Sequence, residues 1–334
     1  LEEIVVSAQR REQSLQEVPI SITAFSSSDV QTLRIDNILD IGLMVPNLSA
    51  VEGSGGTQAI KYQIRGLEAN GTALGADSGV ATYLDGVYLK GGSAAIVSYA
   101  DIERIEVLRG PQGTLFGRNT SGGAIHFITR NPSGEFGFRQ QLTAGNYGNF
   151  RSRTRIDMPQ MGPVRALFNY THSEIEGPVE NLAAGATYDL TPFGGGIETS
   201  PKRLGDEEVH AFSAAIQLDL IDDLDITYKY DYSEREMTPS AVGIIGVQPG
   251  IYQDFMWQPS YSLGRPDKVN NLVHLPSYLD AEGHNLTLEY ALSDSITLKN
   301  ILSYREGSVE VPGQTLDGMG LYLPFLGQPL QQTA

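Results

Sequence analysis

The feature that most constrains this chain is a period-two alternation of apolar and polar residues that recurs beyond residue 133. From residue 224 onward, for example, Leu224, Ile226 and Tyr228 alternate with Asp225 and Thr227. Alternation with this period places apolar side chains on one face of a sheet. Each segment has about ten residues, which is the length of a tilted strand that crosses a bilayer. The predicted strands are 135–146, 149–158, 164–171, 212–219, 224–233, 285–292 and 296–305.

The connections between these segments alternate in length. Those at 160–163, 222–223 and 293–295 are tight, whereas 177–206 and 236–283 are long, and only the connection at 147–148 is unexpectedly short. Transmembrane barrels have short periplasmic turns and long outer loops. A soluble β-sandwich could share the alternation, but it would not be expected to sort its loops in this way. We therefore predict antiparallel transmembrane β-barrel strands.

Composition excludes several classes of protein. A net charge of −17 argues against a nucleic-acid partner, and the absence of cysteine excludes disulfides and thiolate metal sites. The histidines at 126, 172, 210, 274 and 284 are isolated in sequence, without the spacing of a zinc motif. No nucleophile elbow and no catalytic carboxylate pair stand out. We expect no metal site, no cofactor and no enzyme activity.

Residues before 133 have a different character, typical of a small α+β unit with long loops. A strand is predicted over 19–25, and the sequence Ser27-Ser28-Asp29 then offers a cap for a short helix. Asp85-Gly86 is a strong hairpin signal between 82–84 and 87–89.

The stretch from Asp101 to Thr129 is an alternating run that breaks into glycines and resumes as a strand. The pattern over 102–107 is loose enough to be a helical turn leading into a strand, and a short helix fits 112–116. The apolar run 124–128 reads as a strand buried on both faces. Such glycines could form a phosphate cradle, but the Gly-Lys-Ser/Thr ending of a P-loop is missing. A packed glycine-rich turn is the other interpretation.

This stretch closely resembles the end of the plug domain in TonB-dependent outer-membrane receptors. The signature is the run IERIEVLRGPQGTLFGRNTSGGAI, and the elements at 64–66 and 83–87 are also family-like. The resemblance implies a TonB box and linker over 1–16, a plug over 17–133, and the first seven barrel strands over 134–334. The residues that it assigns to the structural motif of the plug are Arg65, Gly66, Arg109, Gly110, Pro111, Gly113, Gly117, Gly122 and Gly123.

The first residues resemble a TonB box, the segment that TonB captures by strand addition. We expect this segment to be a strand on a tether, because it is short and is followed by a polar run over 9–16; an ordinary first strand is the alternative. Its residues are Glu3, Ile4, Val5, Val6, Ser7 and Ala8.

Ligand contacts are expected at the plug loops and the longest outer loop. Aromatic residues in that loop could stack on a ligand, although a loop that packs on itself would look the same. The predicted contacts are Gly55, Gln58, Asn70, Lys90, Tyr252, Phe255 and Trp257. In the family, Arg65 and Arg109 pair with wall glutamates of later strands.

A barrel wide enough to hold such a plug needs about 22 strands. We therefore expect this chain to be the first part of an incomplete 22-stranded barrel, with the remainder missing or in another chain. The resemblance implies location in the outer membrane of a Gram-negative bacterium, in contact with its lipid.

The implied function is active uptake of a scarce ligand, energised by TonB and its inner-membrane complex. A ferric siderophore is the first choice, with cobalamin, oligosaccharides and aromatic compounds also open. Two alternatives from other classes are a passive porin-like channel and a secreted β-rich binding or adhesion protein.

Overall fold

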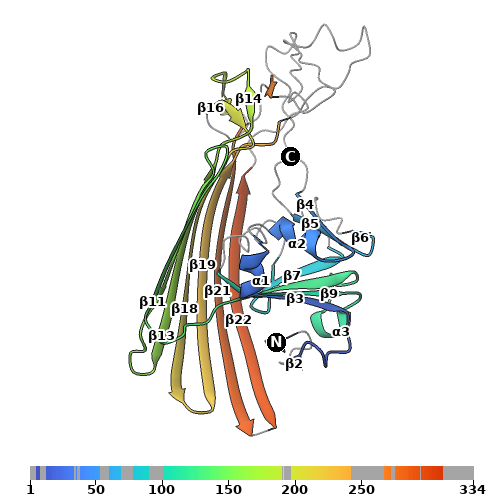
Figure 1. The fold of residues 1–334 in the computed structure, drawn as a ribbon, viewed down its shortest axis with the longest axis vertical. Helices are drawn as coiled ribbons and strands as arrows, with labels where there is room; N and C mark the ends of the chain where they lie inside the picture. Colours follow the sequence, from blue (N-terminus) through green and yellow to red (C-terminus); the bar gives the residue numbers. More distant parts are fainter. Residues whose placement is uncertain are drawn as a thin grey trace.

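The computed structural model describes residues 5–7, 13–33, 35, 38–52, 60–68, 78–89, 101–189, 191, 197–241, 267–271, 275–293 and 295–310. A tall antiparallel sheet, here called the wall, stands beside a smaller α+β unit, here called the plug (Figure 1). Among these residues, no helix has both the length and the apolar character needed to span a membrane.

The wall confirms the predicted strands. Its seven strands follow one another in chain order, each antiparallel to the next, and its two edges, β11 and β22, do not pair with each other in the described part. Several strands are longer than predicted, because they continue into residues next to the long connections. The strands are β11 (Gly137–Ala144), β12 (Phe150–Asp157), β13 (Val164–Ile175), β18 (Glu207–Ile221), β19 (Leu224–Met237), β21 (Ser277–Ser293) and β22 (Ile296–Glu310).

The short first outer connection has a simple local cause. Tyr147 and Gly148 both have positive φ, 58° and 62°, which is the backbone of a type I′ hairpin turn. The amide of Gly145 donates to the carbonyl of Asn149 at 2.8 Å and closes the turn. A turn centred on these two residues therefore reverses the chain within the short connection between β11 and β12.

The plug is built on a five-stranded mixed sheet of order β3-β9-β10-β7-β8. The pair β10–β7 is parallel and the other pairs are antiparallel. β9 is continuous from Ile102, so the helical turn considered at its start is not formed. The strands are β3 (Ile22–Ser26), β7 (Val80–Leu84), β8 (Val87–Leu89), β9 (Ile102–Arg109) and β10 (Gly123–Thr129), and a second sheet holds β4 (Leu48–Glu52), β5 (Ile60–Ile64) and β6 (Leu67–Glu68).

Both faces of the plug sheet are covered, as the apolar run of β10 predicts. One face packs under the short helices and the second sheet, with Ile64, Val107 and Ile125 fully buried. The other face packs under the first residues and a short helix, through Val6 and Phe116 among others. The helical elements are α1 (Ser27–Thr32), η1 (Ile38–Asp40), α2 (Ile41–Met44) and α3 (Gly113–Phe116).

Small sheets form in the outer connections, at the upper end of the wall in Figure 1. One joins β14 (Val179–Asn181) to β17 (Arg203–Leu204) and β20 (Lys268–Val269), and so brings the two long connections together. The other pairs β15 (Thr187–Asp189) with β16 (Ile197–Thr199).

Candidate functional site

The wall presents two chemically different faces. Lys229 and Asn285 reach residues of the plug, so the odd-numbered positions of β19 and β21 point inward. Even-numbered positions point outward, where Tyr170, Leu302 and Tyr304 are 43%, 56% and 62% exposed. The outward face therefore carries the apolar set predicted from the alternation.

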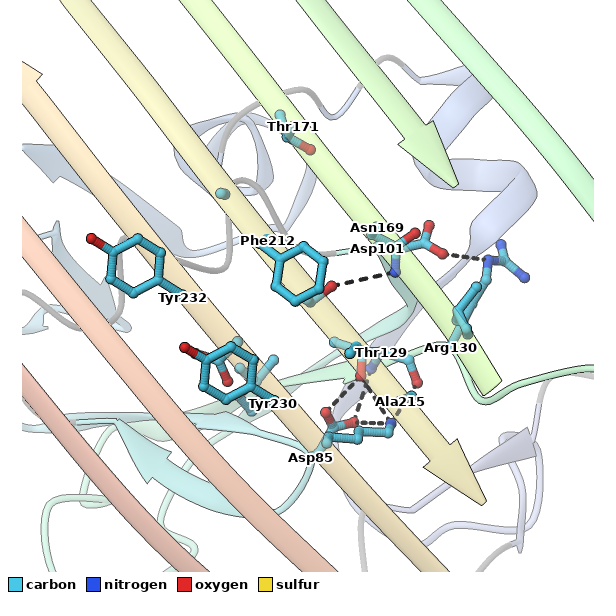
Figure 2. A pocket seen from close by; sticks show the side chains of 17 residues that line it. Asp85, Asp101, Thr129, Arg130, Asn169, Thr171, Phe212, Ala215, Tyr230 and Tyr232 are labelled. Carbon is cyan, nitrogen blue, oxygen red and sulfur yellow. Dashed lines mark hydrogen bonds and ion pairs between the residues drawn. The ribbon is translucent and has the colours of Figure 1, made fainter. Parts of the chain in front are cut away.

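The clearest link between plug and wall is a clamp formed by Asp85, Thr129 and Lys229 (Figure 2). The ammonium of Lys229 lies 3.1 Å from Asp85 Oδ1 and donates to the carbonyl and the hydroxyl of Thr129 at 3.0 and 2.9 Å. Asp85 in turn accepts from the Thr129 hydroxyl at 2.6 Å and from its amide at 2.9 Å. All three ammonium protons have an acceptor, which compensates for the partial burial of the charge.

The position of Asp85 follows from local backbone chemistry. Asp85 and Gly86 have φ of 48° and 84°, as the predicted hairpin turn between β7 and β8 requires. The turn places the carboxylate beside the end of β10, because β7 and β10 are parallel neighbours. The sequence predicts Asp85 as a turn residue within the family-like element 83–87. It does not show that a distant lysine faces this residue.

A second contact lies along the same interface. Asp101 Oδ2 is 3.6 Å from Arg130 Nε and 3.6 Å from Arg155 Nη1 of β12. Burial raises the pKa of Asp101, and the two guanidinium groups oppose that rise. Together with the clamp, Asp101 lines a cavity between the end of the plug sheet and the inner face of β13, β18 and β19 (Figure 2).

The signature glycines close the turn between β9 and β10. Gly110 donates to the carbonyl of Gly122 at 2.9 Å, and Gly122 donates to that of Gly79 at 2.7 Å. Gly123 has φ of 153°, and a Cβ there would collide with the carbonyl oxygen of Leu108. These contacts describe a packed glycine turn, which was one of the two interpretations of the sequence.

The other signature residues lie around this turn. Arg65 and Gly66, with φ of 53° and 79°, form the turn between β5 and β6, and the guanidinium of Arg65 extends toward Gly110. Arg109 ends β9, and its buried Nε has no hydrogen-bond partner within the described part of the chain. Pro111 precedes α3, which begins at Gly113 and ends before Gly117.

The described first residues are docked on the plug. β1 (Val5–Val6) pairs with β2 (Gln13–Ser14), and Val6 is fully buried. The amide of Ser7 donates to Glu106 Oε1 at 2.9 Å, and Arg104 Nε donates to the same oxygen at 2.8 Å. The expectation of a free strand on a tether is therefore wrong for these residues, because Glu106, fully buried in β9, gives them a specific place to bind.

Several predicted residues fall outside the described ranges. Those of the predicted TonB box are Glu3, Ile4 and Ala8, and those of the predicted ligand contacts are Gly55, Gln58, Asn70, Lys90, Tyr252, Phe255 and Trp257. Their assignment stays a prediction, as do the domain boundaries at 16 and 133.

Two of the histidines judged isolated in sequence are adjacent in space. His172 on β13 is directly opposite His210 on β18, and the ring centroids are 4.7 Å apart. Glu208 contacts His210 from the same strand, with 3.2 Å between Oε1 and Nε2. The sequence could not show this cluster, because it depends on the register between two strands that are separated by a long connection.

Comparison with known proteins agrees with this architecture. The sequence model of the TonB-dependent Receptor Plug Domain matches residues 14–124. The vitamin B12 transporter BtuB of Vibrio vulnificus is 30% identical over 147 residues, which are 43% of this chain and 23% of that protein. The ferripyoverdine receptor of Pseudomonas aeruginosa is 27% identical over 163 residues, 48% of this chain and 19% of that protein.

Solved structures show the same fold over most of the chain. The ferric yersiniabactin uptake receptor FyuA from Yersinia pestis superposes with a TM-score of 0.67 at 18% identity, covering 87% of this chain and 41% of that one. The siderophore receptor PiuA from Acinetobacter baumannii gives a TM-score of 0.67 at 16% identity, covering 92% and 39%. The chain thus spans less than half of the proteins that it matches.

Fold and interface together define a plug-and-barrel architecture, with the plug packed against part of a β-barrel wall. The family match then assigns residues 14–124 to the plug domain of TonB-dependent receptors, and the chain resembles receptors of this kind in fold over most of its length. Homologues in this family are outer-membrane transporters and receptors of Gram-negative bacteria, not enzymes.

Proposed function

We propose that this chain belongs to a protein that takes up a ferric siderophore across the outer membrane, driven by TonB and its inner-membrane complex. The observation that carries the proposal is a plug held against the inward face of the wall by the clamp of Asp85, Thr129 and Lys229. A pore closed in this way needs work to open, and a partner that pulls on the plug would supply that work.

The contacts of the plug suggest where the pull would act. Ser7 is bonded to Glu106 in the middle of β9, and β9 pairs with β10, where His126 is opposite Glu106. β10 ends at Thr129, inside the clamp. Strand addition by TonB at β1 would therefore load the hydrogen bond from Ser7 to the Glu106 side chain and, through it, the main-chain ladder of β9 and β10, which ends at the wall.

The ligand class rests on what the similar proteins bind. The names of FyuA, PiuA and the ferripyoverdine receptor refer to siderophores, whereas that of BtuB refers to vitamin B12. A ferric siderophore is thus favoured, and cobalamin is the second candidate. No enzyme activity is part of the proposal.

Uptake assays separate this function from its rivals. Cells that carry the full-length gene should accumulate labelled ferric siderophore more rapidly than cells lacking it. Accumulation should stop when TonB is deleted or when residues 3–8 are removed. Uptake that survives both changes would indicate a passive channel, and recovery of the protein without detergent would indicate a secreted binding protein. Competition with unlabelled cobalamin identifies the second candidate ligand.

A further inference from the structure

The cluster on the outward face of the wall has the composition of a metal site. His172 and His210 form a cross-strand pair, and Glu208 is two residues before His210 and so points to the same side. The potential ligand atoms of the three side chains all lie within 4.8 Å of one another. One ion at their centre could reach all three with bonds of about 2.0–2.2 Å after small rotamer changes.

We propose that His172, Glu208 and His210 bind a divalent transition-metal ion, with Zn²⁺ as the preferred ion. Two imidazoles and one carboxylate suit Zn²⁺, whereas Ca²⁺ and Mg²⁺ prefer oxygen ligands throughout. The three protein ligands leave a fourth tetrahedral position open to water on the exposed side. This proposal is independent of the transported ligand.

Tyr170 already orients one of the ligands. Its hydroxyl lies 2.9 Å from His210 Nδ1, while His210 Nε2 lies 3.2 Å from Glu208 Oε1. In the tautomer that carries its proton on Nδ1 and donates it to the tyrosine oxygen, Nε2 presents its lone pair on the side of the carboxylate, and a metal ion would be bound by these two ligand atoms together. Outer contacts of this kind fix the tautomer and ring orientation of a ligating histidine.

The imidazole of His172 has a ring nitrogen without a hydrogen-bond partner among the described residues. Nδ1 of His172 is shielded from solvent and has no hydrogen-bond partner in the described part of the chain. The ring stacks on that of His210 with an angle of 27° between the planes. Two rings this close can share a cation as ligands, whereas two imidazolium ions in this arrangement would repel each other.

The site lies where an ion could reach it from outside the cell. On β18 the outward positions below His210 are apolar, beginning with Phe212, and they continue toward the tight turns. His210 is therefore at the upper, polar end of this face, below the long connection that joins β13 to β18. A bound ion would join the two strands at the base of that connection.

The wall supplies a matched control. His284 also lies between a tyrosine and a glutamate, with Nδ1 at 2.7 Å from the hydroxyl of Tyr228 and Nε2 at 3.3 Å from Glu282 Oε1. Among the described residues of the wall, only His172, Glu208 and His210 form a group of three potential metal ligands. His284 has Glu282 beside it but no second histidine in such a group. His284→Gln should therefore leave metal binding unchanged.

The test uses untagged protein in detergent, stripped with a chelator and titrated with Zn²⁺ by calorimetry. We expect one site, with affinity lowered more than about tenfold by His172→Gln or His210→Gln, and about tenfold by Tyr170→Phe. With one equivalent of Cu²⁺ on the wild type, electron paramagnetic resonance should show two nitrogen ligands. That spectrum tests the site even if a variant folds poorly.

Three results would overturn the proposal. They are a spectrum with one or no nitrogen ligand, an affinity that His172→Gln and His210→Gln leave unchanged, and an equal loss in His284→Gln. Binding should also weaken as pH falls, because protons compete with the metal for imidazole nitrogen.

Discussion

Lys229 Nζ lies 3.1 Å from Asp85 Oδ1, and this ion pair joins residues 144 positions apart in the chain. The two side chains are 15% and 12% exposed, so water screens them only weakly. Because Thr129 completes the coordination of the ammonium, the pair also fixes the end of β10 against the wall. Asp85, a turn residue of the plug, thus fixes the plug to the wall.

Lys229→Met should loosen the plug. Removing the ammonium leaves Asp85 shielded from water without its counter-charge, which we expect to cost about 3 kcal/mol of plug–wall interaction. The measurement is the permeability of cells to a large antibiotic, together with the rate at which protease cleaves the plug in isolated outer membranes. Both should rise.

A second lysine of the wall serves as the control. Lys299 pairs with Glu289 at 2.9 Å, but both side chains are about half exposed. Lys299→Met should therefore change either quantity little, since exposed pairs contribute about 0–1 kcal/mol. Equal effects of the two substitutions would show that the clamp does not hold the plug.

Glu106→Gln should release the docked first strand. The neutral amide weakens the charge-assisted bonds from Ser7 and Arg104 while keeping the packing of β9. The chain has no cysteine, so Val5→Cys gives a single attachment point for a nitroxide label. We expect a more mobile spectrum in the Glu106→Gln background than in the parent.

Glu103→Gln on the same strand is the control for this experiment, because Glu103 is three residues before Glu106 and therefore points to the opposite face of β9. Its spectrum should match that of the parent. A label that is equally immobile in all three proteins would show that Glu106 does not hold the strand.

Gly123→Ala should destabilise the plug strongly, by about 3 kcal/mol or more. The residue has φ of 153°, and the added methyl would collide with the carbonyl of Leu108 in the paired strand. Gly113→Ala, in α3, has no atom within 4 Å of the added carbon and should be neutral or slightly stabilising. Chemical unfolding of the two variants measures the difference, and similar midpoints would contradict this account.

The architecture could be predicted because it follows from patterns among residues that are close together in the sequence. Alternation sets which face of each wall strand is apolar, and the Asp85-Gly86 turn defines the hairpin of β7 and β8 without any distant contact. The seven wall strands and the buried strand β10 follow from such patterns.

The functional contacts were not predictable in the same way. Lys229 meets Asp85, and His172 meets His210, only through register and through the placement of plug against wall. The docking of β1 also escaped prediction, because a short apolar segment gives no indication that a buried carboxylate, Glu106, will receive it.

Asp101 should make the stability of the plug depend on pH. Its pKa is raised in the folded protein, chiefly by burial, from an ordinary value of 3.8. Its favourable contribution is therefore complete below about pH 4 and is lost as pH rises through the higher, folded-state pKa. The wild type should lose thermal stability relative to Asp101→Asn between pH 4 and pH 7. Asp222→Asn, in an exposed turn, controls for the loss of one carboxylate, and parallel curves for all three proteins would exclude the effect.

Asn181 should hold the two long outer connections together. Its amide nitrogen donates to Ser200 Oγ at 3.0 Å and to the carbonyl of Asn271 at 2.9 Å, while its oxygen accepts from the amides of Ala183 and Asn271. The side chain is 2% exposed, so Asn181→Ala leaves buried groups unpaired at about 1–3 kcal/mol each. Amide hydrogen exchange in β14, β17 and β20 should then accelerate together, whereas Asn300→Ala on the exposed face of β22 should leave it unchanged. If exchange increased in β14 alone, the two connections would not depend on this side chain for their contact.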